Sequence, residues 1–350
     1  MCGVNNGRRF IHTTKKTQAK DTLKPQDHNI KHNCCIPSRL PRSDNLPANR
    51  YSDTTRSTLK PLQQAQLLQQ AQLTSLSGGW FYMGTDKALY PQDGEAPRRR
   101  VFISPFAIAA TTVTNAEFAH FVSATGYQTS AEILGRSFVF KPGANSKSTL
   151  SGSNPVAYAP WWQDTETACW HAPQGHGSTI AEIPDHPVTH VSYTDALHYC
   201  DWSNTRLPTE AQWEYAARGG LADYDFPWGD TLEPNGQHRC NIWQGQFPTN
   251  NTASDSYALT APVNAYPPNA FGLYNMTGNV WEWVADRFTT NHSPRPVKNP
   301  AGPLNGKYYV TRGGSFLCHH SYCARYHVFS RQSLTADTSC ANIGFRVAAC

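Results

Sequence analysis

The sequence of 350 residues contains no long hydrophobic run, so it lacks the clearest signal of a membrane protein. No segment approaches the roughly 18 consecutive apolar residues that a membrane-spanning helix needs. The first thirty residues also contain no apolar stretch of the kind found in a secretory signal peptide. We therefore expect a soluble protein of the cytoplasm, with no membrane partner.

Acidic residues are scarce in the first sixty positions, which hold 12 Lys or Arg but only 4 Asp or Glu. The rest of the chain holds 18 basic and 21 acidic residues, so the body is not basic and no nucleic-acid partner is expected. Few aromatic residues occur in this segment, which therefore cannot bury enough apolar surface to order itself. We predict a flexible basic tail over 1–72 and one catalytic domain over 73–350, with a mitochondrial transit segment as the minor alternative for the tail.

No two of the ten cysteines form a C-x-x-C motif, which leaves zinc ribbons and thioredoxin-type sites without support. Ten is nevertheless a high count for a cytoplasm, where thiols are kept reduced. Cysteines that matter there are more often catalytic or metal-binding than structural. No role can be assigned from the sequence to Cys34, Cys35, Cys169, Cys200, Cys240, Cys340 and Cys350.

Three helix starts are present in the sequence. The predicted N-caps are Thr114, Ser192 and Thr209, and the first and third have a Glu or Gln three positions later, which completes a capping box. Gly126 and Gly219 are the predicted stops of those two helices. The segment LQQAQLLQQAQL, residues 62–73, indicates a further short helix.

Strand-like runs occur at residues 98–108 and 342–348, and long connections rich in Gly, Pro and Asn join the elements. This pattern predicts an α+β fold with few helices and much irregular structure. Irregular chain of this length needs support from bound metal ions or from aromatic packing.

Cys318 and Cys323 lie five positions apart in the segment RGGSFLCHHSYCARY. This spacing suits two thiols that face each other across a tight loop, whereas zinc sites prefer shorter spacings. His319 and His320 would point to opposite faces of an extended stretch and make poor joint ligands. Two interpretations stay open from the residues alone: a structural disulfide, or a reactive pair that binds Cu(I), a soft ion that accepts two sulfur ligands.

The segments GGWFYMGTD, RLPTEAQWEYAARGG, FGLYNMTGNVWEW and RGGSFLCHHSYCARY follow one another in this order. From about residue 78 to 347, these and intervening segments resemble the formylglycine-generating enzymes, or sulfatase-modifying factors. The resemblance implies a fold related to C-type lectins. It also implies an oxidoreductase that uses O2 and copper to convert the cysteine of a C-x-P-x-R motif, in an unfolded or nascent sulfatase, to Cα-formylglycine.

The resemblance assigns catalytic roles to three residues of the last motif. Cys318 and Cys323 would bind Cu(I), and Ser315 would act as an active-site hydroxyl, although a Gly-Gly-Ser turn alone also explains it. The implied substrate-binding residues are Trp161, Trp281, His319, Tyr322, Arg325 and Asn342. Core packing is the alternative role of the two tryptophans, and Arg325 suits peptide carbonyls better than a substrate arginine, since like charges repel.

Two structural Ca²⁺ sites are implied as well. The first would use Asn241, Ile242, Asp255 and Tyr257, and the second Asn275, Gly278, Val280 and Glu282. Mixed carboxylate, amide and carbonyl oxygens are the donors that calcium prefers. Turns rich in Asn and Asp, with no ion, are the alternative.

The sequence departs from the secreted members of this family at the positions of two disulfides. One pair of positions holds Ala217 and Val328, and the other holds Cys200 and Val347. The loss of both bridges agrees with a reducing compartment, and we expect a cytoplasmic, bacterial protein.

The tail contains the segment Cys35-Ile36-Pro37-Ser38-Arg39, which itself spells C-x-P-x-R. This segment could occupy the groove as substrate or competitor; chance, or metal delivery through Cys34 and Cys35, are the alternatives.

Two other functions are possible for a sequence of this superfamily. A non-catalytic C-type-lectin-like binding module of the same superfamily would lack the cysteine pair. An iron-dependent sulfoxide synthase-type domain would need an additional helical domain with a histidine cluster, and the tail is too short and too polar to supply one.

Overall fold

A computed structural model describes residues 36–37, 73–144 and 152–350, and these all belong to one compact unit, Asn33–Cys350. The predicted tail, apart from residues 36 and 37, and the helix predicted over 62–73 lie outside the described residues, except that Leu73 begins the first strand. Within the described part of the chain, no helix combines the length and apolar character that crossing a bilayer requires.

The helices begin where the sequence predicts. The described α-helices are α2 (Asn115–Thr125), α3 (Ser130–Leu134), α4 (Tyr193–Ser203) and α5 (Glu210–Arg218), with short 3-10 helices η1 (Pro91–Asp93) and η2 (Pro234–Gly236). Thr114, Ser192 and Thr209 each form a complete capping box, which confirms the three predicted starts. Helix α3 was not predicted, although Thr129 and Glu132 form a capping box there too.

The described strands form five small sheets. The largest two have the orders β14-β13-β11-β15 and β1-β4-β16-β8, namely Arg331–Thr335, Tyr308–Arg312, Trp281–Arg287 and Ile343–Phe345, then Leu73–Leu76, Phe106–Ala109, Ala348–Ala349 and Thr205–Arg206. The others are β12-β3-β2 (Val297–Lys298, Arg99–Ile103, Gly79–Met83), β5-β7-β6 (Arg136–Phe140, Ala159–Glu166, Ser153–Val156) and β10-β9 (Asn250–Asn251, Gly245–Gln246). The predicted strand runs correspond to β3 with β4, and to β15 with the start of β16. The predicted α+β class is therefore confirmed.

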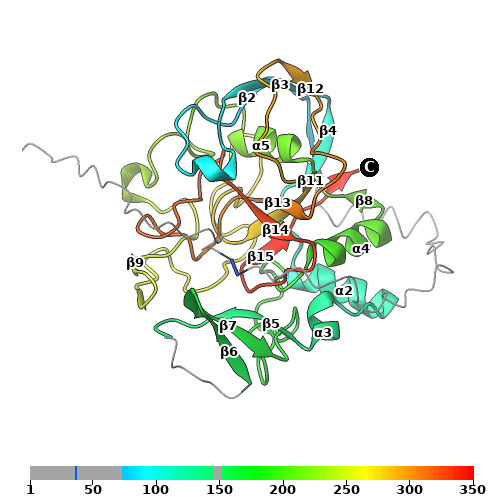
Figure 1. Cartoon of the computed structure of the whole chain (residues 1–350), viewed down its shortest axis with the longest axis vertical. Coiled ribbons are helices and arrows are strands. Elements are labelled where there is room, and N and C mark those ends of the chain that lie inside the picture. Colours follow the sequence, from blue (N-terminus) through cyan, green and yellow to red (C-terminus); the bar gives the residue numbers. More distant parts are fainter. Residues whose placement is uncertain (1–35, 38–72, 145–151) are drawn as a thin grey trace, which may run out of the picture. The chain divides into compact units, whose positions relative to one another are not determined.

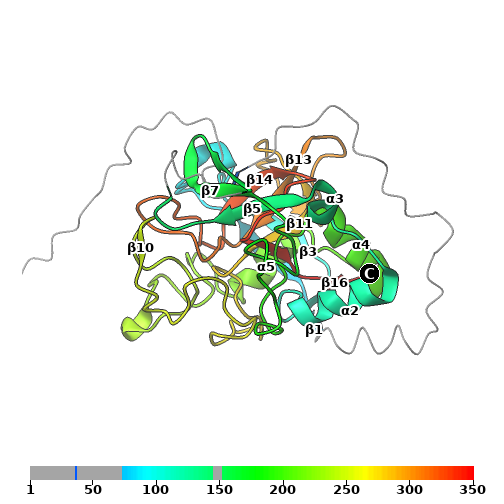
Figure 2. The same cartoon turned by 90° about the horizontal axis from the view of Figure 1, so that it is seen from below.

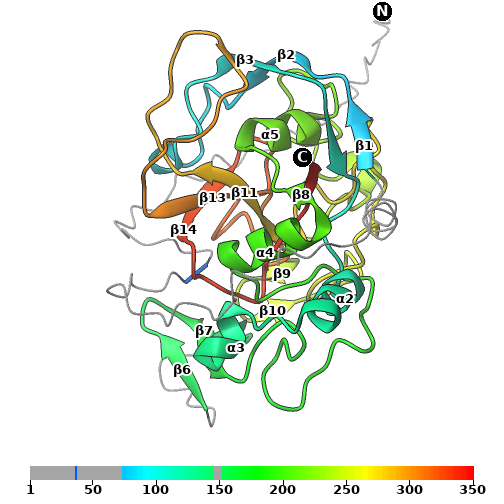
Figure 3. The same ribbon diagram turned by 90° about the vertical axis from the view of Figure 1, so that its right-hand side faces the viewer.

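Helix α5 lies between two of the sheets (Figures 1 and 3). Ala211 packs with Val101 of β3, and Ala216 packs with Val284 of β11 and Val310 of β13. Alanines on both sides let the helix approach each sheet closely. On the other side of the fold, α2 packs on α4 (Figure 2). Helix α5 thus holds the sheet from which the cysteine loop emerges.

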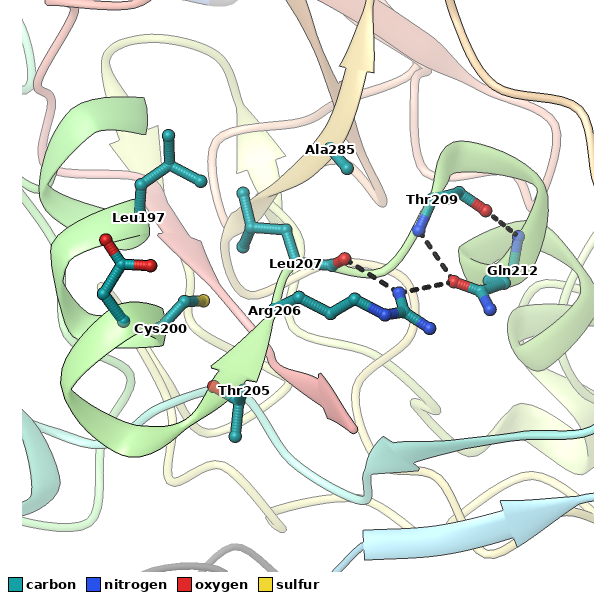
Figure 4. A pocket seen from close by; sticks show the side chains of 9 residues that line it. Leu197, Cys200, Thr205, Arg206, Leu207, Thr209, Gln212 and Ala285 are labelled. Atoms are coloured by element: carbon teal, nitrogen blue, oxygen red, sulfur yellow. Dashed lines mark hydrogen bonds between the residues drawn. The ribbon is translucent and has the colours of Figure 1, made fainter. Parts of the chain in front are cut away.

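Apolar packing occupies the positions of the two family disulfides. Ala217 and Val328 are fully buried in one hydrophobic cluster, and Cys200 and Val347 are buried in another. Figure 4 shows Cys200 on α4, beside Leu207 in a pocket next to Arg206. Burial raises the pKa of the Cys200 thiol to about 12, so this sulfur is a neutral core group and not a nucleophile.

Candidate active site

The two cysteines lie on the loop that joins β13 to β14. The loop starts with two glycines at positive φ, and a Cβ on Gly314 would lie only 2.5 Å from the carbonyl oxygen of Arg325. His319 and Cys323 exchange two backbone hydrogen bonds of 3.1 and 2.8 Å, which closes a tight turn. The turn brings the sulfurs of Cys318 and Cys323 to 3.5 Å from each other, as the spacing predicts.

The two sulfurs are in different chemical states. Cys318 is a thiol, whereas Cys323 is disulfide-bonded. They are therefore not bonded to each other, and a structural disulfide between them is not formed. The other described cysteines are also thiols, so none of them is the partner of Cys323. Both side chains are only 1% exposed, which means that an incoming substrate must displace whatever covers them.

Ser315 connects the sulfur pair to Asn342. The backbone N–H of Ser315 donates to Cys318 Sγ at 3.4 Å, and its Oγ accepts from Asn342 Nδ2 at 2.9 Å and from Leu317 N at 3.3 Å. With two donors already on Oγ, the hydroxyl hydrogen is left to donate. The Oδ1 of Asn342 is buried and has no hydrogen-bond partner among the described residues. Hydrogen bonds thus link three predicted site residues, Cys318, Ser315 and Asn342.

Arg325 is held by two residues that the sequence analysis missed. Its Nε donates to Asp93 Oδ2 at 2.5 Å, and its guanidinium lies 3.7 Å from the ring centre of Tyr90. The hydroxyl of Tyr90 also accepts the N–H of Ala324 at 2.9 Å. The Nη1 of Arg325 is 3.8 Å from Cys323 Sγ, so the guanidinium places a fixed positive charge beside this sulfur. Nothing in the local spacing of Tyr90 and Asp93 could have indicated this role.

A partly exposed aromatic group lies beside the cysteine turn. Trp161 of β7 makes edge contacts with Tyr322 at 5.2 Å and with Phe247 at 5.6 Å, and Phe247 stacks on Tyr322 at 4.4 Å. Phe247 was not predicted, although it belongs to the segment NIWQGQFPTNNT, which resembles the family. Trp281, by contrast, is fully buried in β11.

His319 is buried beside the turn, while His320 is exposed. Burial, with a smaller contribution from His320, lowers the pKa of His319 to about 4, so it is neutral at pH 7. Its Nδ1 lies 2.7 Å from Ser321 Oγ. Within the described ranges, no three His, Cys, Asp or Glu side chains gather as metal ligands. The sulfur pair therefore does not form part of a zinc site built from such side chains there.

The first predicted calcium site contains an orphaned acceptor. Asn241 is 1% exposed, and its Oδ1 has no hydrogen-bond partner in the described structure. The carboxylate of Asp255 accepts the N–H groups of Ile242 and Tyr257, each at 3.2 Å, and burial raises its pKa. A buried acceptor and a buried carboxyl group are both stabilised by a cation, so these residues fit the predicted ion.

The second predicted site repeats this feature at Asn275, whose buried Oδ1 also has no partner within the described residues. Gly278 has a φ of 76°, and a Cβ there would lie 2.5 Å from the carbonyl oxygen of Asn241, so the two predicted sites adjoin. Val280 is buried next to them. Glu282 differs, because Arg346 donates to both of its carboxylate oxygens at 2.7 and 2.8 Å. The charge of Glu282 is thus already balanced by the chain itself.

The chain is similar to several known proteins. The family description "Sulfatase-modifying factor enzyme 1-like domain" matches residues 58–350. The chain is 51% identical over 277 residues to the formylglycine-generating enzyme of Bos taurus, covering 79% of this chain and 74% of the relative. It is also 51% identical over 286 residues to that of Thermomonospora curvata, covering 79% and 93%. The solved structure of PvdO from Pseudomonas aeruginosa is similar, with a TM-score of 0.56 and 27% identity over 79% of this chain and 93% of that chain.

Proposed function

The chain belongs to the sulfatase-modifying factor family, and from this premise we propose that it oxidises the cysteine of a C-x-P-x-R segment in a sulfatase polypeptide to Cα-formylglycine with O2. The family relatives are named for this product. The observation that carries the proposal is the pair of sulfurs 3.5 Å apart on one buried turn. A binding module would have no need of such a pair.

The donor set supports Cu(I) as the cofactor. Two adjacent sulfurs, with no cluster of harder ligands among the described residues, suit a soft ion. Cys318 and Cys323 would hold it, and Cys323 must first be released from its disulfide, because the thiolate is the metal-binding form. Copper, when bound, would supply an open position at which a substrate thiol and O2 react.

The chain's own residues bind and orient the substrate around this pair. The partly exposed group of Trp161, Phe247 and Tyr322 offers an aromatic surface for the proline of the motif. Ser315, fixed by Asn342, directs its hydroxyl hydrogen away from its two donors and can hold an oxygen or sulfur of the reacting group. Arg325, held by Asp93, keeps a positive charge beside the sulfur of Cys323.

The function is tested on a synthetic peptide that contains C-x-P-x-R. After incubation with the reduced protein, copper and O2, an aminooxy probe should label the new aldehyde, and mass spectrometry should place it at the motif cysteine. Omission of copper, or replacement of the motif cysteine by serine, should remove the label. An unlabelled peptide under the complete conditions, with a protein shown to be folded and copper-loaded, would contradict the proposal.

We also propose that the two calcium sites are filled in the working enzyme and tie the irregular chain around Asn241 and Asn275 to the core. The two orphaned amide oxygens support this, because a buried acceptor without a partner costs free energy that a hard cation would offset.

A further inference from the structure

The segment Cys35–Arg39 carries the motif of the proposed substrate within the chain itself. Two of its residues, Ile36 and Pro37, are among the described residues, and both are buried. The exposed fraction of Ile36 is 0%. An isoleucine from a polar, basic region therefore packs in the interior of the body. Its burial is not expected from the composition of that region.

Ile36 belongs to the same hydrophobic cluster as Cys318 and Cys323, and Trp161 and Tyr322 pack against that cluster. Figures 1 and 3, which differ by a quarter turn, both draw the Ile36–Pro37 fragment between β14 and β7. Strand β7 carries Trp161, and β14 follows the cysteine loop. The middle of the motif thus lies on the side of the fold where the proposed substrate proline would bind.

The state of Cys323 adds an independent observation. It is disulfide-bonded, and the partner is neither Cys318 nor any other described cysteine. The sequence places Cys35 directly before Ile36, within one residue spacing of about 3.8 Å between Cα atoms. We propose that the chain's own Cys35–Arg39 segment fills the substrate groove, with Cys35 disulfide-bonded to Cys323, and so keeps the enzyme inactive until a thiol releases it. The proposal rests on the proposed function, since it takes the groove to be a substrate site.

O2 can act as the oxidant that forms this inhibitory disulfide between Cys35 and Cys323, which we call the lock. The thiols of Cys35 and Cys323 each lose one hydrogen, the two sulfurs form a bond, and O2 takes the two protons and two electrons as hydrogen peroxide. In release, a small thiolate attacks the disulfide at Cys35, and Cys323 leaves as a thiolate. A second thiol then frees Cys35, and the overall result is the oxidation of two small thiols to one disulfide.

The tether makes the lock effective without a high intrinsic affinity. A ligand on the same chain has an effective concentration that reaches the millimolar range for a short flexible connection. A free peptide at micromolar concentration would therefore compete poorly, even when the disulfide is reduced. Removal of the Cys35–Arg39 segment from the groove should therefore lower the apparent KM for a substrate peptide by about tenfold or more.

The linkage is tested in the full-length protein, purified without reductant. Remaining thiols are blocked with an alkylating reagent, the protein is digested, and disulfide-linked peptides are identified by mass spectrometry. Wild type and Cys34→Ser, the matched control one position away, should both give the peptide pair that joins Cys35 to Cys323. Cys35→Ser should give an alkylated Cys323. Joining of Cys323 to Cys34 or to Cys2, or an unlinked Cys323 in wild type, would overturn the proposal.

A kinetic comparison separates this proposal from the proposed function. Cys35→Ser should turn over the substrate peptide without prior reduction, whereas Cys34→Ser should need a reductant first. If Cys35→Ser is folded and copper-loaded but makes no aldehyde, the proposed function fails while the mapped disulfide stands. If both variants turn over equally without reductant, the lock is excluded. An aldehyde found at Cys35 itself would make the segment a substrate, and would likewise exclude its role as an inhibitor.

Discussion

The turn that carries the two cysteines and the strands on either side of it are stabilised in different ways. Arg312, at the end of β13, and Arg331, at the start of β14, are both buried and form ion pairs with the glutamates of α5. Between them, the loop is closed by backbone hydrogen bonds, glycines and two adjacent sulfurs. Two buried ion pairs thus fix the ends of the loop, whereas the turn that carries the sulfurs is closed by its own backbone hydrogen bonds.

The charges at the ends are closely matched. Arg312 Nη2 is 2.5 Å from Glu214 Oε2, and Arg331 Nε is 2.7 Å from Glu210 Oε1. Burial alone would raise the pKa of Glu210, but Arg331 and Arg312 outweigh it and hold the value at about 2. The glutamates therefore stay ionised at every physiological pH. The ion pairs at the two ends of the loop, its anchors, therefore do not depend on the oxidation state of Cys318 and Cys323.

Substitution of either sulfur should have the largest effect on activity and little effect on the fold. Cys318→Ser and Cys323→Ser should each lower aldehyde formation by more than about 100-fold, since loss of a group that only orients a ligand already costs 10–100-fold. In the presence of a reductant, which opens the disulfide of Cys323 in wild type as well, urea unfolding should change little, because the ion pairs of Arg312 and Arg331 remain. Cys169→Ala, another buried thiol, is the control and should keep full activity. Retained turnover in both serine variants would sink the catalytic role.

The anchors should show the reverse pattern, with the largest loss of stability in the set. Arg312→Met leaves the buried charge of Glu214 without this partner and should lower the free energy of unfolding by about 3–5 kcal/mol. The matched control is Arg98→Met, which removes a surface ion pair with Asp223 and should cost less than about 1 kcal/mol. Urea unfolding of the three proteins measures both values. Equal losses in the two variants would show that burial of the pair does not matter.

The sequence predicted features that depend on neighbouring residues and missed those that depend on contacts between distant segments. Capping boxes at Thr114, Ser192 and Thr209 are local signals, and they placed three helices correctly. The cysteine turn was also predicted, because its two thiols are close in sequence. Contacts between distant segments were not accessible in this way. The pairing of Asp93 with Arg325, which lie 232 positions apart, depends on the complete fold.

The long-range pairing of Arg312 with Glu214 was missed for the same reason. Each residue alone looks like an ordinary charged residue of a strand or helix, and such residues are usually exposed. The Ile36–Pro37 fragment is the sharpest example. The composition around it predicts a mobile tail, and only the structure shows that these two residues are buried.

Bound Ca²⁺ should stabilise the irregular chain around Asn241 and Asn275, as the buried ion pairs stabilise the ends of the cysteine loop. If the orphaned oxygens of Asn241 and Asn275 bind ions, free Ca²⁺ at 100 times its Kd should raise the free energy of unfolding by about 2.7 kcal/mol per site. Thermal unfolding with added Ca²⁺ or with a chelator measures this shift. Asn241→Ala and Asn275→Ala should each lose part of it, while the exposed Asn291→Ala should keep all of it. No shift in wild type would leave the two amides as turn residues.

Asp286 gives the smallest expected effect, because it borders the anchors without an ion pair of its own in the described structure. Its Oδ2 accepts the N–H of Glu210 at 2.6 Å, and burial, followed by the charge of Glu210, raises its pKa to about 7. In the unfolded chain an aspartate titrates near pH 4. Between about pH 4 and 7 the folded protein therefore holds one more proton than the unfolded chain. The stability contributed by this proton falls as the pH rises, by at most about 1.4 kcal/mol per pH unit. Asp286→Asn keeps the acceptor but cannot titrate, so urea unfolding at pH 5, 6, 7 and 8 should show that this component of the slope is lost. Identical slopes in wild type and variant would mean that Asp286 is ionised in the fold, as the anchor glutamates are.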